Sequence, residues 1–208
     1  MRHMMIFGLG VWVALMLTAA AAQGEPGPSG SARAAVEKIV HDALAVLRNP
    51  KLSAEEKRIQ FRDVAYQNMD FQILSRLALG RHWRELSDGQ RTELVEQIKQ
   101  HIAKNYSHIT DNYTDEDVTI TGDRQETDGD WTVQTKVVST NKDGAPQDVA
   151  KVVYRLRQHD GGWKVIDISV EDVSMVINCR DEFQGIIADG GIDHLLDMLR
   201  KQNAIADK

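Results

Sequence analysis

The chain has 208 residues, of which 42% are hydrophobic and 27% are charged, and its formal net charge is −6 at pH 7. This composition is typical of a soluble globular protein with enough apolar residues for one core, and it excludes a chain that is disordered throughout. The acidic balance argues against binding nucleic acids or anionic lipid surfaces through bulk charge, and a single cysteine excludes an intrachain disulfide and a cysteine-rich zinc site.

The first 22 residues have the pattern of a cleavable secretory signal peptide. Arg2 provides a positive start, residues 4–17 are apolar, and residues 20–22 are alanines that suit signal peptidase. The apolar run is shorter than the roughly 20 residues of a membrane-spanning helix, although an uncleaved N-terminal anchor is the alternative. We expect residues 1–22 to direct the chain to the bacterial periplasm, residues 23–30 to form a flexible leader and residues 31–208 to form a single domain.

Helical periodicity predicts four consecutive helices after this leader, because apolar residues recur at steps of three and four. The expected ranges are residues 31–49, 53–65, 71–79 and 88–109. Polar side chains suited to capping precede the last three of them: Ser53, Asp70 and Ser87. Pro50 and Gly80 are expected to end the first and the third helix.

Beyond residue 112 the apolar residues alternate, which predicts strands. The four expected strands cover residues 118–121, 131–140, 147–157 and 163–170. Their connections contain the turn sequences Asp128-Gly129, Asp143-Gly144 and Asp160-Gly161, so consecutive strands are expected to pair antiparallel. Val152, Tyr154 and Leu156 share one face of the third strand, which makes one side of the sheet apolar.

The periodicity becomes helical again near the end of the chain. Helices are expected over residues 181–188 and 193–203, with a break at Gly190-Gly191. Helices, then a sheet, then helices in sequence order predict an α+β fold, in which the N- and C-terminal helices cover the apolar side of a four-stranded antiparallel sheet.

The motifs common in hydrolases, nucleotide-binding proteins and zinc proteases do not occur in the sequence. His101 and His108 lie two turns apart on one predicted helix, and we expect a solvated or half-buried helix face there and not a metal site. The acidic residues 115–117 lack the glycine and the distal glutamate of a calcium loop. We therefore predict no metal ligands and no catalytic residues.

Two His–Asp pairs and the single cysteine were considered as reactive groups. The neighbours in His41-Asp42 and in Asp193-His194 point about 100° apart on a helix, so neither pair is expected to form an acid-base dyad. Cys179 is expected to be a small buried apolar residue, with a reactive thiol as the alternative.

Four segments, in one order and spacing, carry a resemblance to a known family. They are LSRLALGRHW at residues 74–83, VYRL followed by DGGWKVID at residues 153–167, EDVSMVINCRDEF at residues 171–183 and GIDHLLDML at residues 191–199. Over residues 36–201 the chain resembles the MlaC (toluene-tolerance) family of periplasmic phospholipid-binding proteins. It departs from the family at Asp172, where glycine is usual, and at Cys179, where an aromatic residue is common.

The resemblance implies a curved antiparallel sheet wrapped by helices around an apolar cavity for acyl chains. It further implies a carrier of glycerophospholipid between an outer-membrane lipoprotein–porin complex and an inner-membrane ABC transporter complex with its substrate-binding membrane subunit. The diacyl lipid would be cargo, with no cofactor and no nucleic-acid partner. Two acyl chains carry about 30 methylene groups at about 0.8 kcal/mol each, so their exposure to water costs about 24 kcal/mol and a carrier must enclose them almost completely.

Under this resemblance, the residues expected to line the cavity are those on the predicted apolar faces. They are Leu74, Leu77, Trp83, Ile102, Tyr106, Val152, Tyr154, Ile166, Ile168, Val170 and Val173. Trp83 and Tyr154 also have polar ends that suit a cavity mouth. Arg76, Arg81 and Arg84 could contact a phosphate, but these side chains are expected to be solvated or paired with carboxylates.

Two alternative functions are compatible with the same elements. One is a carrier of another lipid, such as a hopanoid-like polycyclic molecule. The other is an enzyme in which an α+β cone holds an acid-base pair in its pocket. The identity of any co-purifying hydrophobic molecule separates the carriers from each other, and substitution of the histidines tests the enzyme.

Overall fold

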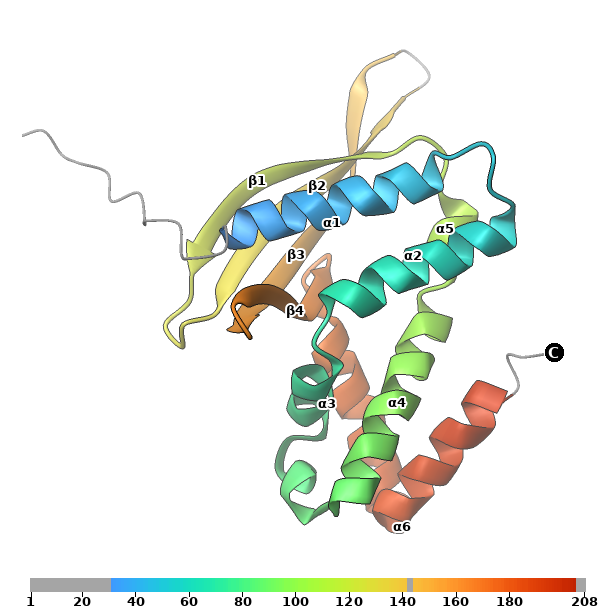
Figure 1. The fold of residues 1–208 in the computed structure, drawn as a ribbon, viewed down its shortest axis with the longest axis vertical. Helices are drawn as coiled ribbons and strands as arrows, with labels where there is room; N and C mark the ends of the chain where they lie inside the picture. Colours follow the sequence, from blue (N-terminus) through green and yellow to red (C-terminus); the bar gives the residue numbers. More distant parts are fainter. Residues whose placement is uncertain (1–30, 142–143, 205–208) are drawn as a thin grey trace, which may run out of the picture.

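A computed structural model describes residues 31–141 and 144–204 of the chain. The predicted signal peptide and leader, residues 1–30, lie outside the described residues. The structure confirms the α+β class: an open antiparallel sheet in the order β1-β2-β3-β4-β5 occupies one half of the molecule, and a group of helices occupies the other (Figure 1). Within the described residues no helix is both long and apolar enough to cross a bilayer.

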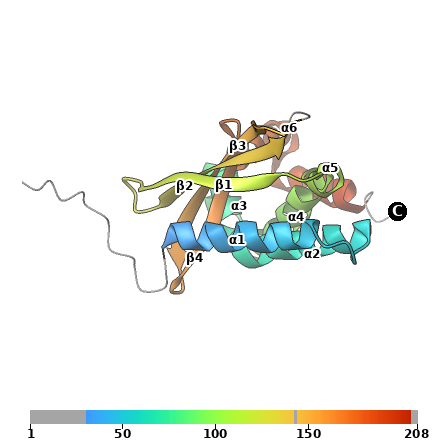
Figure 2. The same ribbon diagram turned by 90° about the horizontal axis from the view of Figure 1, so that it is seen from above.

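The first two helices form a hairpin beside the sheet. These helices are α1 (Ala32–Leu47) and α2 (Ala54–Asn68). The Ser31 hydroxyl accepts a hydrogen bond from the backbone N–H of Ala34, and the predicted capping box of Ser53 and Glu56 is present at the start of α2. α1 packs against β1 and β2, and it runs alongside β1 when the molecule is seen from above (Figure 2).

The remaining helices are α3 (Phe71–Leu79), the 3₁₀ helix η1 (Gly80–Glu85), α4 (Asp88–Asn105), α5 (His108–Asn112) and α6 (Met175–Ala204). Of these helices, α5 lies beside α2, and the others pack below the sheet in Figure 1. As predicted, the side chains of Asp70 and Ser87 cap α3 and α4. α3, α4 and α6 pack against one another and form the helical half of the core.

The largest differences from the predicted helix boundaries are at the end of α4 and the start of α6. The long helix expected to reach residue 109 ends at Asn105, where the Ser107 hydroxyl donates a hydrogen bond to the carbonyl of Lys104, and α5 is a separate turn. The helix expected to begin at residue 181 begins at Met175. The expected break is confirmed as a kink inside α6, where Gly191 has a φ of 79°.

The sheet has five strands where four were predicted. They are β1 (Asp117–Gln125), β2 (Trp131–Thr140), β3 (Pro146–His159), β4 (Gly162–Val170) and β5 (Val173–Ser174). β5 follows a turn in which Glu171 and Asp172 have φ values of 49° and 64°, and it pairs with the end of β4. Two residues are too few to show an alternating pattern, so this strand escaped the sequence prediction.

The strand register separates an apolar face from a polar face. Val133, Tyr154 and Ile168 are cross-strand partners on neighbouring strands and therefore share a face, as do Thr132, Arg155 and Asp167 on the other side. The register shifts once in each of the three long pairings, which are β1–β2, β2–β3 and β3–β4. Such irregularities increase local twist, consistent with the curved sheet in Figure 1.

Candidate lipid-binding site

The centre of the apolar face holds a polar atom without a protein partner. Tyr154 lies between Val133 and Ile168 and packs against the hydrophobic core. Its hydroxyl makes no hydrogen bond to any residue in the described ranges, and burial raises the pKa of Tyr154 to about 12. The Tyr154 side chain is half-buried, so its hydroxyl can contact a bound molecule or water.

An apolar groove of about 390 Å³ runs between α1 and β1. Its walls are formed by Val40, Leu44 and Ala45 from α1 and by Val118 and Ile120 from β1. Through the strand pairings, the two β1 side chains share a face with Thr135 and Val152, and hence with Tyr154. The groove therefore lies over the apolar side of the sheet.

Polar side chains surround this groove and hold the two ends of α1. Glu37, His41, Arg48 and Asp117 complete its lining. Near the start of α1, Arg33 Nη1 lies 3.2 Å from Asp123 Oδ1, and just beyond its end Arg48 Nη2 lies 3.3 Å from Asp117 Oδ1. The middle of α1 thus meets β1 through apolar side chains, and its ends meet β1 through exposed ion pairs.

The predicted lining residues occupy three kinds of position. Leu74, Ile102 and Ile166 are fully enclosed in the core. Leu77, Trp83, Tyr106, Val152, Tyr154 and Ile168 are half-buried, and Val170 and Val173 are exposed. The structure brings together Val152, Tyr154, Ile168 and Val170 on one sheet face through the β3–β4 register. The lipid contacts of all eleven remain predictions.

Leu77 and Trp83 do not border the α1–β1 groove. They line a second pocket, of about 380 Å³, between α3, η1, α4 and α6. The remaining residues around this pocket are Arg76, Gly80, Arg84, Arg91 and Arg180.

Sequence reasoning missed the residues of the α1–β1 groove. Val40, Leu44, Val118 and Ile120 belong to ordinary apolar stripes of a helix and a strand, and such stripes are also present where side chains fill a core completely. The apolar periodicity indicates which faces of α1 and β1 are apolar, but not that a groove remains between them.

The structure corrects one expectation about the His–Asp pairs. His41 Nδ1 lies 3.2 Å from Asp42 Oδ1, so these neighbours do meet, although the His41 side chain is 81% exposed. The hydrogen bond from Lys38 lowers the pKa of Asp42 most, and the hydrogen bond with His41 lowers it further. Asp193 instead accepts a hydrogen bond from Gln90 Nε2 at 3.1 Å.

The described residues hold no group of three His, Cys, Asp or Glu side chains arranged for a metal ion. His101 is buried in α4, with its Nε2 3.3 Å from Glu182 Oε2 and 2.9 Å from Asn105 Nδ2. Cys179 is a buried free thiol, as expected, and burial raises its pKa to about 12. Neither side chain borders the α1–β1 groove.

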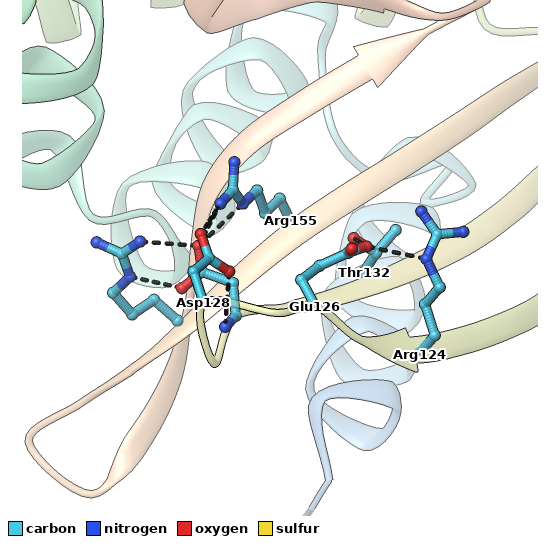
Figure 3. Close-up of polar contacts among 7 residues, drawn as sticks. Arg124, Glu126, Asp128, Thr132 and Arg155 are labelled. Carbon is cyan, nitrogen blue, oxygen red and sulfur yellow. Dashed lines mark hydrogen bonds and ion pairs between the residues drawn. The ribbon is translucent and has the colours of Figure 1, made fainter.

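The polar face of the sheet carries a network of ions that is separate from the groove. Asp128 and Arg155 form an ion pair, while Glu126 accepts hydrogen bonds from Thr132 and from Arg124 (Figure 3). Asp130, in the same turn, accepts hydrogen bonds from Arg155 and Arg157. The network joins the β1–β2 turn to β3.

Comparison with known proteins places this arrangement in a family. A solved structure of the phospholipid-binding protein from Ralstonia solanacearum, in complex with a phospholipid, is 26% identical, has a TM-score of 0.71 and covers 85% of this chain and 99% of that chain. A second solved chain, an NTF2 variant by its name, is 17% identical and covers 65% of this chain and 95% of its own, but its TM-score of 0.36 supports no argument.

No curated protein matches the chain significantly. The sequence model of the MlaC protein family matches residues 37–201, in close agreement with the range over which the resemblance was recognised. Because this match spans well over half of the sequence and the fold agrees with that of a phospholipid-binding structure, the chain belongs to the MlaC family.

Proposed function

We propose that this protein is a periplasmic carrier that binds a glycerophospholipid by its acyl chains. The observation that carries the proposal is the apolar groove under α1, which lies over the sheet face that holds the unpartnered Tyr154 hydroxyl. Membership of the MlaC family, whose members are periplasmic, and the phospholipid in the Ralstonia relative support the choice of ligand and compartment.

In this proposal the protein shuttles lipid between an outer-membrane lipoprotein–porin complex and an inner-membrane ABC transporter complex with its substrate-binding membrane subunit. The diacyl lipid is the cargo, no cofactor takes part and the protein is not an enzyme. Because the acyl chains leave one apolar environment for another, the hydrophobic free energy nearly cancels between membrane and carrier. Direction must therefore come from the partner complexes.

The groove must widen to admit a whole lipid. Pockets that hold drug-sized ligands measure about 300–1,000 Å³, and the groove, at about 390 Å³, is near the lower end. α1 is the element that we expect to move. Its ion pairs of Arg33 with Asp123 and of Arg48 with Asp117 are exposed and contribute only about 0–1 kcal/mol each, so the main cost of displacement is the packing of its buried apolar residues. Loaded protein is therefore expected to have α1 displaced from β1.

The primary test is the identity of co-purifying lipid. Protein purified without detergent is extracted with organic solvent, and the extract is analysed by mass spectrometry. The proposal predicts about one diacyl phospholipid per chain. A polycyclic lipid would support the hopanoid-like alternative, and a lipid-free protein that takes up nothing from liposomes would contradict the carrier function.

A charge placed in the groove tests its position. Leu44 is half-buried in the groove, so Leu44→Glu should reduce extraction of lipid from liposomes at least tenfold by placing a carboxylate against the acyl chains. Ile59→Glu is the matched control, because Ile59 is 38% exposed on α2 and does not line the groove. Equal uptake by the two folded variants would remove the groove from the proposal.

A further inference from the structure

The pocket at the far end of the helical half is surrounded by positive charge. Arg76 from α3, Arg84 from η1, Arg91 from α4 and Arg180 from α6 all line its volume of about 380 Å³. Its other lining residues are uncharged, and they are Leu77, Gly80 and Trp83. This concentration of guanidinium groups contrasts with the net charge of −6 of the whole chain.

Two of these guanidinium groups lack a partner within the described residues. Arg76 and Arg84 make no ion pair and no hydrogen bond there, and neither does the nearby Arg81. All three side chains are exposed, so of the two expected environments, solvation or pairing with carboxylates, the structure shows the solvated one. Of the four arginines around the pocket, only Arg91 has a carboxylate, since its Nη1 lies 2.9 Å from Asp88 Oδ1.

The other two guanidinium groups are held in place by backbone carbonyls. Arg180 donates from Nε and Nη2 to the carbonyl oxygen of Leu77, at 3.2 and 2.6 Å. Arg91 donates from Nε to the carbonyl of Trp83, at 3.3 Å, and its guanidinium carbon lies 5.7 Å from the centre of the Trp83 ring. A ligand would not have to order these side chains, which lowers the entropy cost of binding.

The backbone between α3 and η1 also contributes to the pocket. Gly80 ends α3 with a φ of 57° and a ψ of −123°, a conformation that residues with a Cβ rarely adopt. η1 begins at this residue, and Arg76, before it, and Arg84, after it, both line the same volume. The change of direction between α3 and η1 therefore lies beside the two arginines without a partner.

Four guanidinium groups around a small volume, two of them exposed and without a carboxylate partner, favour the binding of an anion. Guanidinium groups pair through two parallel N–H donors with the oxygens of phosphates and carboxylates. A phosphate group offers more acceptor oxygens than a carboxylate, so several guanidinium groups can donate hydrogen bonds to it at once. Trp83 and Leu77 provide an apolar wall on one side, which suits the carbon atoms of an ester next to the phosphate.

We propose that this arginine pocket, lined by Arg76, Arg84, Arg91 and Arg180, binds a phosphate-bearing anion at a site separate from the acyl-chain groove. The shared chemistry is a tetrahedral phosphate, supplied by the headgroup of an anionic phospholipid in a membrane surface or by free phosphate. The site does not depend on lipid carriage, because it is formed by α3, η1, α4 and α6 and not by α1 and β1.

The test uses the tryptophan side chains as reporters. Inorganic phosphate is titrated into the delipidated and the lipid-loaded protein, and the indole N–H resonances are followed by NMR. Trp83 should shift in a saturable manner in both forms, while Trp131 and Trp163, which contact each other at the sheet, should not. In a separate experiment, the fraction of protein that co-sediments with phosphatidylglycerol vesicles is compared with the fraction that co-sediments with phosphatidylcholine vesicles.

Two double variants distinguish binding in the arginine pocket from an effect of the overall charge of the protein. The double variant Arg76→Gln/Arg84→Gln should weaken phosphate binding or phosphatidylglycerol binding at least fivefold. The matched control Arg62→Gln/Arg81→Gln removes the same number of exposed charges outside the pocket and should change binding less than twofold. Equal losses in the two double variants would show a bulk-charge effect and overturn the site.

The arms of the test also identify the source of the phosphate. A Trp83 shift without a vesicle preference supports a free phosphate, and a vesicle preference without a Trp83 shift supports a lipid headgroup, provided that the pocket variant abolishes it. The absence of both effects would overturn the proposal. Tighter binding of a polyglutamate peptide than of either phosphate probe would also overturn it, in favour of an acidic protein partner.

Discussion

Arg157 binds both carboxylate oxygens of Asp130, with Nε 2.6 Å from Oδ1 and Nη2 2.8 Å from Oδ2. The carboxylate is 1% exposed, whereas the arginine side chain is 38% exposed. Arg155 Nε donates to the same carboxylate at 2.9 Å, in the network that includes the Asp128–Arg155 pair of Figure 3. A buried carboxylate is stable here because two guanidinium groups compensate for its lost hydration.

Substitution of Asp130 should therefore destabilise the β1–β2 turn and the sheet. Removal of one partner of a buried ion pair costs about 3–5 kcal/mol, and because both arginines remain partly hydrated we expect Asp130→Asn to cost about 2–3 kcal/mol. Urea unfolding followed by circular dichroism measures this loss. The control is Asp148→Asn, which breaks only the exposed pair with Lys136 and should cost less than about 1 kcal/mol. Similar losses in the two variants would contradict the assignment.

Ser174 should contribute to stability as the cap of α6. Its hydroxyl accepts a hydrogen bond from the backbone N–H of Ile177, at 3.1 Å, and donates to Asp167 Oδ2, at 2.6 Å. Ser174→Ala is expected to lower the free energy of unfolding by about 1–2 kcal/mol. Ser169→Ala, on the same side of the molecule in β4, is the control with little expected effect. If both variants unfold at the same urea concentration as the parent, the cap is not energetically important.

Tyr154→Phe should stabilise the lipid-free protein slightly, because it removes a hydroxyl on a half-buried side chain that has no hydrogen-bond partner among the described residues. We expect the free energy of unfolding to rise by about 1 kcal/mol at pH 7. Tyr113→Phe should have the opposite effect, since the Tyr113 hydroxyl accepts a hydrogen bond from Arg48 Nε at 3.0 Å. A loss of stability in Tyr154→Phe would reveal a protein partner for that hydroxyl.

The same tyrosine predicts a pH dependence in the alkaline range. The pKa of Tyr154 is raised to about 12 from its ordinary value of 10, so the folded state keeps the proton that the unfolded state loses above pH 10. The contribution of this group to stability is complete below pH 10 and is lost as the pH rises towards 12. Urea titrations at pH 9 and 11 should show a larger loss for the parent than for Tyr154→Phe.

Cys179 should be unreactive in the folded protein. Burial raises its pKa to about 12, so only about one thiol in ten thousand is ionised at pH 8, and the side chain is also shielded from reagents. Labelling with a chromogenic disulfide should be far slower than for glutathione and should become rapid on addition of urea. Rapid labelling of the native protein would indicate an accessible thiol at the start of α6.

Much of the secondary structure follows from local patterns in the sequence. Ser53, Asp70 and Ser87 cap helices where the sequence predicts it, and the turns at Asp128-Gly129 and Asp160-Gly161 join antiparallel strands, because a cap or a tight turn depends on a few adjacent residues. Asp143, in the third predicted turn, lies outside the described residues. The Gly191 kink is predictable for the same reason. The family is also recognisable from sequence, since four of its segments keep their order and spacing.

Features that depend on distant residues are not predictable in this way. α6 begins six residues earlier than expected because Asp167, on a neighbouring strand, accepts a hydrogen bond from the backbone N–H of Val176 at 3.0 Å. The two-residue strand β5 exists only because β4 offers it a partner. Local periodicity contains no information about such partners.

The sequence alone determines most of the helices and the four long strands, which of their faces are apolar and to which family the chain belongs. The tertiary structure alone decides that a groove remains between α1 and β1, and that arginines from α3, η1, α4 and α6 surround one pocket. The physical reason is that an apolar stripe is the same whether its partner surface fills the space or leaves it open. Charges far apart in the chain meet only after the elements that carry them have packed.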